Sequence, residues 1–174
     1  MSLSSLIAVY YKHAEELATF RRVSDEETPE PYRSLLSHSS HMTVTVERFH
    51  GERVDVQVLR SHSDAKHYYR EILLRTHATH HVVQYGMVRL NLENVPELPR
   101  HEILEEAKPL GRVLIEHDVL REIELFDLFE VTCGPALAAL LEVPLGARTF
   151  GRTALLHCNR EPAIELLEIV APAR

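Results

Sequence analysis

The spacing of apolar residues along the chain changes its period near residue 50. Between residues 3 and 21, apolar side chains recur every three or four positions, which predicts an amphipathic helix over this segment. The acidic, proline-containing run 24–32 predicts the end of that helix, and a second short helix is expected over 32–39. Beyond residue 50 the apolar residues alternate with polar ones, a pattern typical of half-buried β-strands.

Six later segments have the composition or the alternation expected of strands. Residues 67–76 and 81–92 are strongly β-prone and lie one short loop apart, so they predict a hairpin. A last hairpin is expected across the turn sequence NREP, near the end of the chain. The expected strands cover residues 52–60, 67–76, 81–92, 120–133, 148–158 and 163–171.

Three further helices are expected around these strands, over 98–107, 109–117 and 135–143, and the second begins with Pro109 in its first turn. Strands outnumber helices, and most neighbouring strands are separated by loops of hairpin length. This pattern predicts an α+β fold, in which a single antiparallel β-sheet carries flanking helices on one face.

The chain is expected to form one domain, because 174 residues without a repeat or linker fit a single core. Within residues 1–174 we expect an N-terminal helical segment over 1–39, followed by the sheet and its flap helices over 40–174. No stretch approaches the ~20 apolar residues that span a bilayer, and the N-terminus lacks the basic region of a signal peptide. A cytoplasmic protein without a membrane partner is therefore expected.

The charge balance bears on the class of ligand. A formal net charge of −7 argues against nucleic acid as a partner, since such proteins present a basic face. Any site for a small anionic ligand must then be built locally, by a few placed arginines. Cys133 and Cys158 are far apart in the sequence and fit no metal-binding or disulfide framework, so we interpret both as reduced thiols in strands.

Three of the 12 histidines fall in the stretch RTHATHH (75–81), whose spacing suggests a metal site. The expected hairpin places His77 and His80 in its turn and His81 at the start of the next strand. If that strand is extended, His80 and His81 point to opposite faces, whereas a catalytic zinc site needs three converging ligands. No metal is therefore expected, and a metal-dependent protein stays as an alternative. Its third ligand would have to come from His38, His41, His62 or His67.

Four segments, taken in order, resemble the chorismate pyruvate-lyase family, including its short bacterial and archaeal branch. They are SHMTVTVERFHG (40–51), YYREILL (68–74), the region from LP to PLGRVL (98–114) and GRTALLHCNREPAIELLEIVAP (151–172). The resemblance implies an antiparallel sheet with helical flaps that close over a buried site. It also implies an enzyme that cleaves chorismate to 4-hydroxybenzoate and pyruvate, without metal or organic cofactor.

The resemblance implies roles for single residues. Arg70 matches the arginine that binds the ring carboxylate in the family, and Leu110 matches the position whose backbone N–H binds the same carboxylate. Met42 matches a methionine beside the ligand. Glu168 matches the carboxylate of the last strand that contacts the 4-hydroxyl group, and Glu165 is its rival, although a spacing of three along a strand points it to the opposite face. Arg70 and Glu168 are therefore the expected catalytic residues.

Three further positions complete the expected site or depart from the family's pattern. The best-known members carry an arginine directly after a glycine where this chain has Gly86-Met87, and Gly86 is expected to bind substrate. Leu167 stands where those members have a hydroxyl residue before the glutamate. Arg152, near the start of an expected strand, is the candidate to meet the second carboxylate of the substrate.

The chemistry of lysis fits these residue types. Chorismate is a dianion, and a buried arginine holds a carboxylate through two parallel hydrogen bonds while it stays charged. A carboxylate near the C4 oxygen can orient the hydroxyl or accept a proton. A cofactor-free lyase that acts on chorismate or an analogue is therefore the main interpretation.

A non-catalytic binding domain of the same fold is the main alternative. The helix expected over 135–143, followed by VPLGARTFGRT, also resembles the effector-binding domain of GntR-type repressors, which would take a small aromatic or carboxylate ligand. Such repressors carry a DNA-binding helix-turn-helix ahead of that domain. Here only residues 1–39 precede the sheet region, with no basic recognition helix, and this favours the enzyme.

Overall fold

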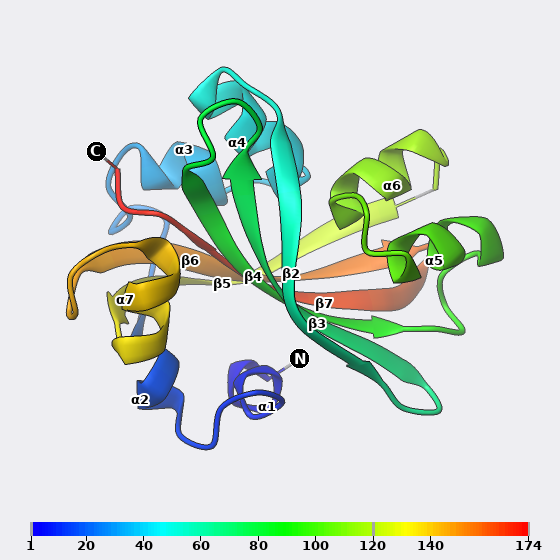
Figure 1. The fold of residues 1–174 in the computed structure, drawn as a ribbon, viewed down its shortest axis with the longest axis horizontal. Coiled ribbons are helices and arrows are strands. Elements are labelled where there is room, and N and C mark those ends of the chain that lie inside the picture. The colour runs from blue at the N-terminus through cyan, green and yellow to red at the C-terminus, as the bar shows by residue number, and fades with distance from the viewer. Residues whose placement is uncertain (1, 120, 174) are drawn as a thin grey trace.

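The computed structural model describes residues 2–119 and 121–173, which form a seven-stranded sheet and seven helices (Figure 1). The helices are α1 (Leu3–Ile7), α2 (Ala14–Leu17), α3 (Tyr32–Leu36), α4 (Met42–His50), α5 (Glu97–Leu104), α6 (Leu110–Glu116) and α7 (Pro135–Leu141). The strands are β1 (Ala18–Val23), β2 (Val54–Ser63), β3 (His67–Thr76), β4 (Val82–Asn91), β5 (Arg121–Cys133), β6 (Arg148–Cys158) and β7 (Glu161–Val170). All neighbouring pairs are antiparallel, in the order β1-β5-β6-β7-β4-β3-β2, which confirms the predicted α+β fold.

Two hairpins form the centre of the sheet. Strands β3 and β4 are joined across the histidine stretch, and β6 and β7 are joined through Asn159 and Arg160. Both of these turn residues have positive φ angles, 52° and 71°, the backbone shape that matches a two-residue turn to the twist of its strands. Pairing of β4 with β7 then joins the hairpins, so that β3 and β7 are separated by β4 alone.

Helices cover both faces of the sheet, so the prediction that they lie on one face was wrong. Helices α1, α2 and α7 pack on one face, called here the α1/α7 face, against residues such as Leu73, Tyr85 and Leu167. Helices α3 to α6 pack on the other, called the α4/α6 face, against residues such as Ile72 and Leu166. The central strands are apolar at consecutive positions, and a strand of that kind must be covered on both sides.

The N-terminal segment is not the single helix predicted over residues 3–21. It contains two short helices, and residues Ala18–Val23 form the edge strand β1, paired with β5. Cross-strand contacts outweigh the helical spacing of this segment: the rings of Phe20 and Phe129 meet edge to face, with centroids 5.8 Å apart. Arg21 also forms an ion pair across the strands, 2.9 Å from Glu130.

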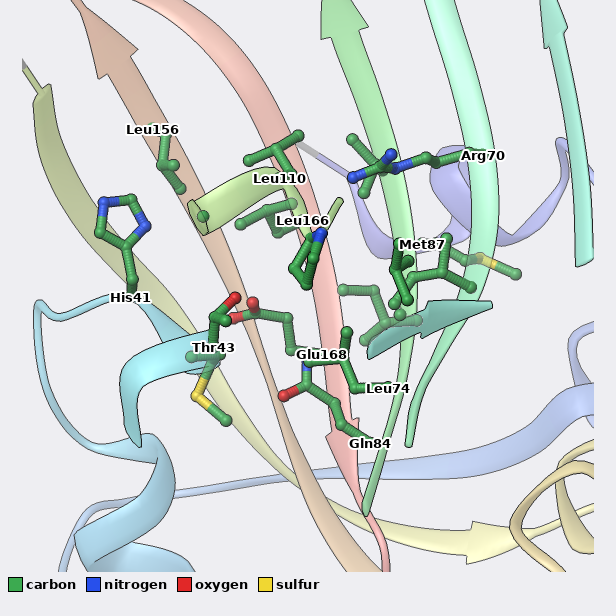
Figure 2. Close-up of a pocket in the computed structure, with 18 of the residues that line it drawn as sticks. His41, Thr43, Arg70, Leu74, Gln84, Met87, Leu110, Leu156, Leu166 and Glu168 are labelled. Atoms are coloured by element: carbon green, nitrogen blue, oxygen red, sulfur yellow. The ribbon is translucent and has the colours of Figure 1, made fainter. Parts of the chain in front are cut away.

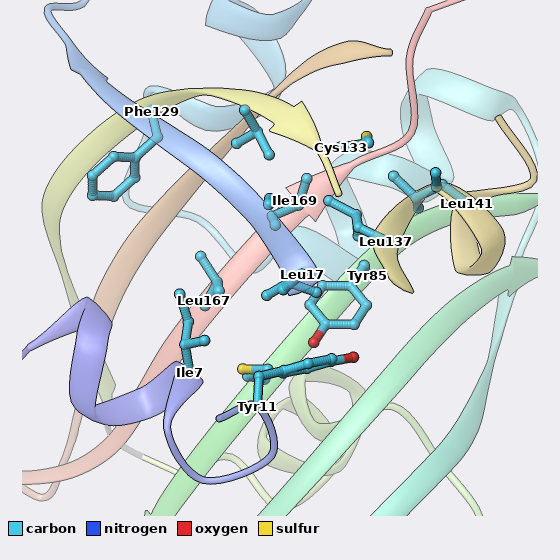
Figure 3. Close-up of a cluster of buried hydrophobic side chains, with 14 of the residues drawn as sticks. Ile7, Tyr11, Leu17, Tyr85, Phe129, Cys133, Leu137, Leu141, Leu167 and Ile169 are labelled. Carbon is cyan, nitrogen blue, oxygen red and sulfur yellow. The ribbon is translucent and has the colours of Figure 1, made fainter. Parts of the chain in front are cut away.

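A buried carboxylate holds the N-terminal segment to the α1/α7 face. Glu71 is 1% exposed and accepts hydrogen bonds from the hydroxyls of Tyr11 (2.5 Å) and Tyr85 (2.7 Å) and from Nε of Arg60 (2.7 Å). Burial, together with the hydrogen bond to Glu71 and its charge, raises the pKa of Tyr11 to about 12, so this phenol stays a donor. Figure 3 shows the Tyr11 and Tyr85 rings side by side beneath the apolar cluster.

The two cysteines and the lengths of the helices bear on predictions made from the sequence. Cys133 and Cys158 are buried thiols at the ends of β5 and β6, as the sequence predicted. Among the helices that the structure describes, none has both the length and the apolar character required to cross a bilayer.

We expect Tyr11→Phe to lower the free energy of unfolding by about 2 kcal/mol, because the buried Glu71 carboxylate loses a charge-assisted hydrogen bond. Tyr10→Phe is the matched control: its hydroxyl makes a long contact of 3.4 Å with the Arg60 carbonyl near the surface, so a loss below about 0.5 kcal/mol is expected. Urea unfolding followed by circular dichroism measures both. Equal losses would contradict the role of Glu71 as the anchor of this segment.

Candidate functional site

One cavity on the α4/α6 face gathers the residues selected from the sequence (Figure 2). Strands β3, β4, β6 and β7 form its floor, and the first turns of α4 and α6 cover it. The centre of a water-sized sphere can occupy about 50 Å³ of this space, which is room for a few water molecules in the ligand-free protein. The structure brings together every residue expected at the site: Met42, Arg70, Gly86, Leu110, Arg152 and Glu168.

The register of the central strands explains how distant parts of the sequence meet on this floor. Side chains on one face of a sheet line up in rows across paired strands. One row runs through Arg70, Val88 and Leu166. The next row runs through Ile72, Gly86, Glu168 and Arg152, and the one after it through Leu74, Gln84 and Val170.

Two glycines keep this space open. A Cβ atom at Gly86 would lie 3.2 Å from Cδ1 of Ile72, so any side chain there would intrude on the floor beside Glu168. A Cβ atom at Gly111 would lie 2.9 Å from Oγ1 of Thr43, so glycine is what lets the start of α6 approach the start of α4 this closely. Leu110, in the first turn of α6, lies over the cavity (Figure 2). The expected hydrogen bond from its backbone N–H to a ligand stays a prediction.

Arg70 is the charged group with the greatest unused hydrogen-bonding capacity in the cavity wall. Its side chain is 1% exposed, and its Nε and Nη1 atoms have no hydrogen-bond partner among the described residues. Burial lowers the pKa of Arg70, while Tyr68 and the charge of Glu106 act in the opposite direction. The Tyr68 hydroxyl itself donates to Glu106, at 2.6 Å. Leaving buried N–H groups of a charged side chain unpaired costs stability, and an anion in the cavity would satisfy them.

Arg152 and Glu168 form a buried ion pair on the opposite wall. Nε of Arg152 donates to Oε2 of Glu168 at 2.7 Å, and their side chains are 1% and 10% exposed. Nη1 of Arg152 donates to the carbonyls of Leu36 and His38, at 3.2 and 2.8 Å, and Nη2 to that of Ser40, at 3.1 Å. Each nitrogen of Arg152 therefore already has a protein acceptor. Its expected contact with a second substrate carboxylate stays a prediction, and the observed contacts make it a positioning residue.

The same arginine fixes the loop that leads into α4. His38 in this loop bonds the Leu35 carbonyl through Nε2, at 2.7 Å, and Nδ1 accepts from the Ser40 N–H, at 3.0 Å. These contacts fit the neutral ring with its proton on Nε2. Burial and the charge of Arg152 lower the pKa of His38, which keeps the ring neutral at physiological pH. The first turn of α4, with Met42 and Thr43, is thereby held over the cavity.

The structure adds residues that the sequence analysis missed. Gln84 is buried in the cavity wall, and its Oε1 has no hydrogen-bond partner among the described residues. A lone amide in the apolar run HVVQYGMV is the signal that could have identified it, by the same reasoning that selected Glu168. His41 and Thr43 also line the cavity. Glu165 faces away from the cavity, as its spacing predicted, and the structure shows it paired with Arg89.

The histidine stretch forms the exposed tip of the β3–β4 hairpin. His77 bonds Asp55 through Nδ1, at 2.7 Å, and His80 has a positive φ angle of 57° in the turn. Within residues 2–119 and 121–173, no group of three or more histidine, cysteine, aspartate or glutamate side chains is arranged to hold a metal ion. The absence of a native metal stays a prediction.

Comparison by sequence finds no relative: no protein-family model matches the chain. No curated protein matches it either. Any evidence for kinship must therefore come from the fold.

Several solved structures share that fold at low identity. The effector domain of PhnF from Mycobacterium smegmatis is 13% identical, with a TM-score of 0.55 over 78% of this chain and 90% of that one. The gene product SA0254 from Staphylococcus aureus N315 is 13% identical, with a TM-score of 0.52 over 68% and 82%. The ligand-binding domain of a regulator ascribed to the GntR family, from Bordetella bronchiseptica, is 16% identical, with a TM-score of 0.50 over 68% and 85%. The chain thus has the chorismate lyase-like fold of GntR effector domains.

The two buried arginines of the cavity are expected to respond in opposite ways to the same substitution. Arg70→Met should raise the free energy of unfolding by about 1–3 kcal/mol in the ligand-free protein, because it removes a buried guanidinium with two nitrogens that lack a hydrogen-bond partner among the described residues. Arg152→Met, the matched control, should lower the free energy of unfolding by about 3 kcal/mol or more, because it leaves the Glu168 carboxylate and the loop carbonyls without their hydrogen-bond donor. Guanidinium unfolding in a buffer free of carboxylates and phosphate measures both. A loss in Arg70→Met equal to that in Arg152→Met would show that Arg70 has structural partners.

Proposed function

We propose that this cavity binds a small organic acid, whose carboxylate Arg70 holds. The observation that carries the proposal is the pair of unpartnered nitrogens, Nε and Nη1, on a guanidinium that is buried in the wall of the cavity. Nε–H forms one edge of the planar guanidinium with Nη2, and Nη1 forms the other edge with Nη2. A carboxylate at either edge therefore accepts from one of the two unpartnered nitrogens. Binding then removes the cost of the unpaired donors.

The surroundings of Arg70 support a ligand of this kind. The chain as a whole carries a formal net charge of −7, so attraction for an anion must come from the cavity itself. The positive end of the nine-residue helix α4 faces the same space and adds a favourable field. Much of the remaining wall is apolar and suits the body of an aliphatic or aromatic acid; it includes Ile72, Leu110, Leu156 and Leu166.

The comparisons support a binding function. The solved structures with this fold include one described as an effector domain and one described as a ligand-binding domain. We extend that use of the fold to this chain, and we place its ligand site in the Arg70 cavity.

Chorismate lysis is the second candidate, and the position of Glu168 favours it. This carboxylate lies across the cavity from Arg70, where it could orient the 4-hydroxyl of chorismate (Figure 2). Lysis removes the C4 proton and breaks the C3–O bond, and it releases 4-hydroxybenzoate and pyruvate. Chorismate carries two carboxylates, however, and the nitrogens of Arg152 already donate to protein acceptors. For this reason we place binding ahead of catalysis.

Calorimetric titration with benzoate and 4-hydroxybenzoate tests the binding proposal. We expect one saturable site in the wild type and at least 30-fold weaker binding in Arg70→Met, because the charged fork is lost. Arg89→Met is the matched control: it removes an arginine of the neighbouring strand β4, where Arg89 pairs with Glu165 on the opposite face, and should bind as the wild type does. Absence of saturable binding to the wild type would contradict the proposal.

Incubation of the protein with chorismate tests the second candidate function, chorismate lysis. EDTA-treated protein is mixed with chorismate, and 4-hydroxybenzoate and pyruvate are followed by chromatography. Turnover that survives chelation, and that is lost in Arg70→Ala and in Glu168→Gln, would establish the lyase. Chorismate that stays intact while the acids bind would leave the binding function alone.

A further inference from the structure

The cavity contains a second buried residue with an unpartnered polar atom, and the hydrogen-bonding character of that atom is opposite to that of the Arg70 nitrogens. Gln84 is 3% exposed, lines the cavity and presents an Oε1 atom that accepts no hydrogen bond from any described residue. Arg70 offers donors, whereas this oxygen is an acceptor. A buried acceptor left unpaired destabilises the ligand-free protein, so the unpartnered atoms of the two residues together specify what a ligand must supply.

The strand register separates these two groups and places Gln84 beside a second acceptor. Gln84 lies opposite Val170, so it is the diagonal neighbour of Glu168 on the same face, with Cα atoms roughly 7–8 Å apart. Arg70 lies one row away from Glu168 and two strands across, roughly 12 Å between Cα atoms at ordinary sheet spacings.

The close-up of the cavity shows the same separation. In Figure 2 the Arg70 guanidinium is at one side, the Glu168 and Gln84 side chains are at the other, and the side chains of Leu110 and Leu166 lie between them. The cavity is therefore polar at both ends and apolar in its middle. Its two ends require groups of opposite hydrogen-bonding character.

The charges of the cavity set the charge of its ligand. Arg70 and Arg152 bring positive charges to the cavity wall and Glu168 a negative one, and the charge of Glu106, which accepts from Tyr68, acts on Arg70 from behind that wall. The ion pair of Arg152 with Glu168 is already complete, whereas Nε and Nη1 of Arg70 have no hydrogen-bond partner among the described residues. One carboxylate can accept from Arg70. A second carboxylate at the far end would face Glu168 and the carbonyl oxygen of Gln84.

We infer that the ligand is a monocarboxylic acid that carries a hydrogen-bond donor, such as a hydroxyl or amino group, at the end opposite its carboxylate. Gln84 is then the residue that selects for this donor. The inference rests on the proposed function of the cavity and adds the class of its ligand. An analogue without the donor leaves the Gln84 oxygen buried and unpaired, so it should bind more weakly. A dianion with its second carboxylate at that end should also bind more weakly, because Glu168 repels the second charge.

Matched acids test this inference by calorimetric titration. The aromatic pair is 4-hydroxybenzoate and 4-methylbenzoate, in which a methyl group of similar size replaces the hydroxyl. The aliphatic pair is 5-hydroxypentanoate and hexanoate, and terephthalate supplies the dianion. In the wild type we expect the hydroxy acid of at least one pair to bind tenfold or more tightly than its methyl analogue, and terephthalate to bind more weakly than either benzoate.

Gln84→Met, of similar size but without the carbonyl, should reduce the preference for the hydroxyl to threefold or less. Equal binding of hydroxy and methyl acids to the wild type would overturn the inference and leave the proposed function intact. A preference that survives in Gln84→Met would remove Gln84 from the selection. Failure of every acid to bind would overturn the proposed function as well. If Gln84→Met does not fold, the preferences of the wild type still decide the ligand class.

Discussion

The candidate site depends on one unusual condition, a guanidinium that is buried in the sheet and has two nitrogens without partners. Such a group is costly in a folded domain and persists where the surrounding structure holds it in place. Strand β3 provides that support through the next residue. Arg70 and Glu71 point to opposite faces, and Glu71 is fixed by Tyr11, Tyr85 and Arg60. Glu71, whose carboxylate has its hydrogen-bond donors on the α1/α7 face, therefore anchors strand β3. The same strand presents Arg70, with its unpartnered nitrogens, on the α4/α6 face.

The opposite wall of the cavity differs from the Arg70 wall, because the charged groups there, Arg152 and Glu168, are paired with each other. Arg152 joins Glu168 to the loop carbonyls of Leu36, His38 and Ser40, so a single side chain sets the position of β7 and of the start of α4. Two glycines complete the cavity, one in its floor and one where α6 meets α4. A rigid frame with one unsatisfied cation is well suited to recognising an anion, since little has to be reordered when the ligand enters.

The sequence predicted the sheet and the residues of the cavity better than it predicted the layers around them. Strand alternation and turn residues are local signals, so β2 to β7 lie close to the predicted segments, and Arg70 and Glu168 come together because their strands do. The strand at Ala18–Val23 was missed because its conformation depends on pairing with β5, more than 100 residues later. The covering of both sheet faces by helices was missed because it also depends on contacts between segments that are far apart in the sequence. The pairing of Arg152 with Glu168 depends on their register, which a single sequence does not reveal.

The most direct test of this account is the nuclear magnetic resonance spectrum of the arginine Nε–H groups in ¹⁵N-labelled protein. The Arg70 signal is assigned by its absence in Arg70→Lys, and the Arg152 signal by its absence in Arg152→Lys. When 4-hydroxybenzoate is added, we expect the Arg70 proton to shift downfield as its Nε–H gains an acceptor. The Arg152 signal, already bonded to Glu168, should keep its position. A shift of Arg152 alone, or no shift of either signal at saturating acid, would contradict the account.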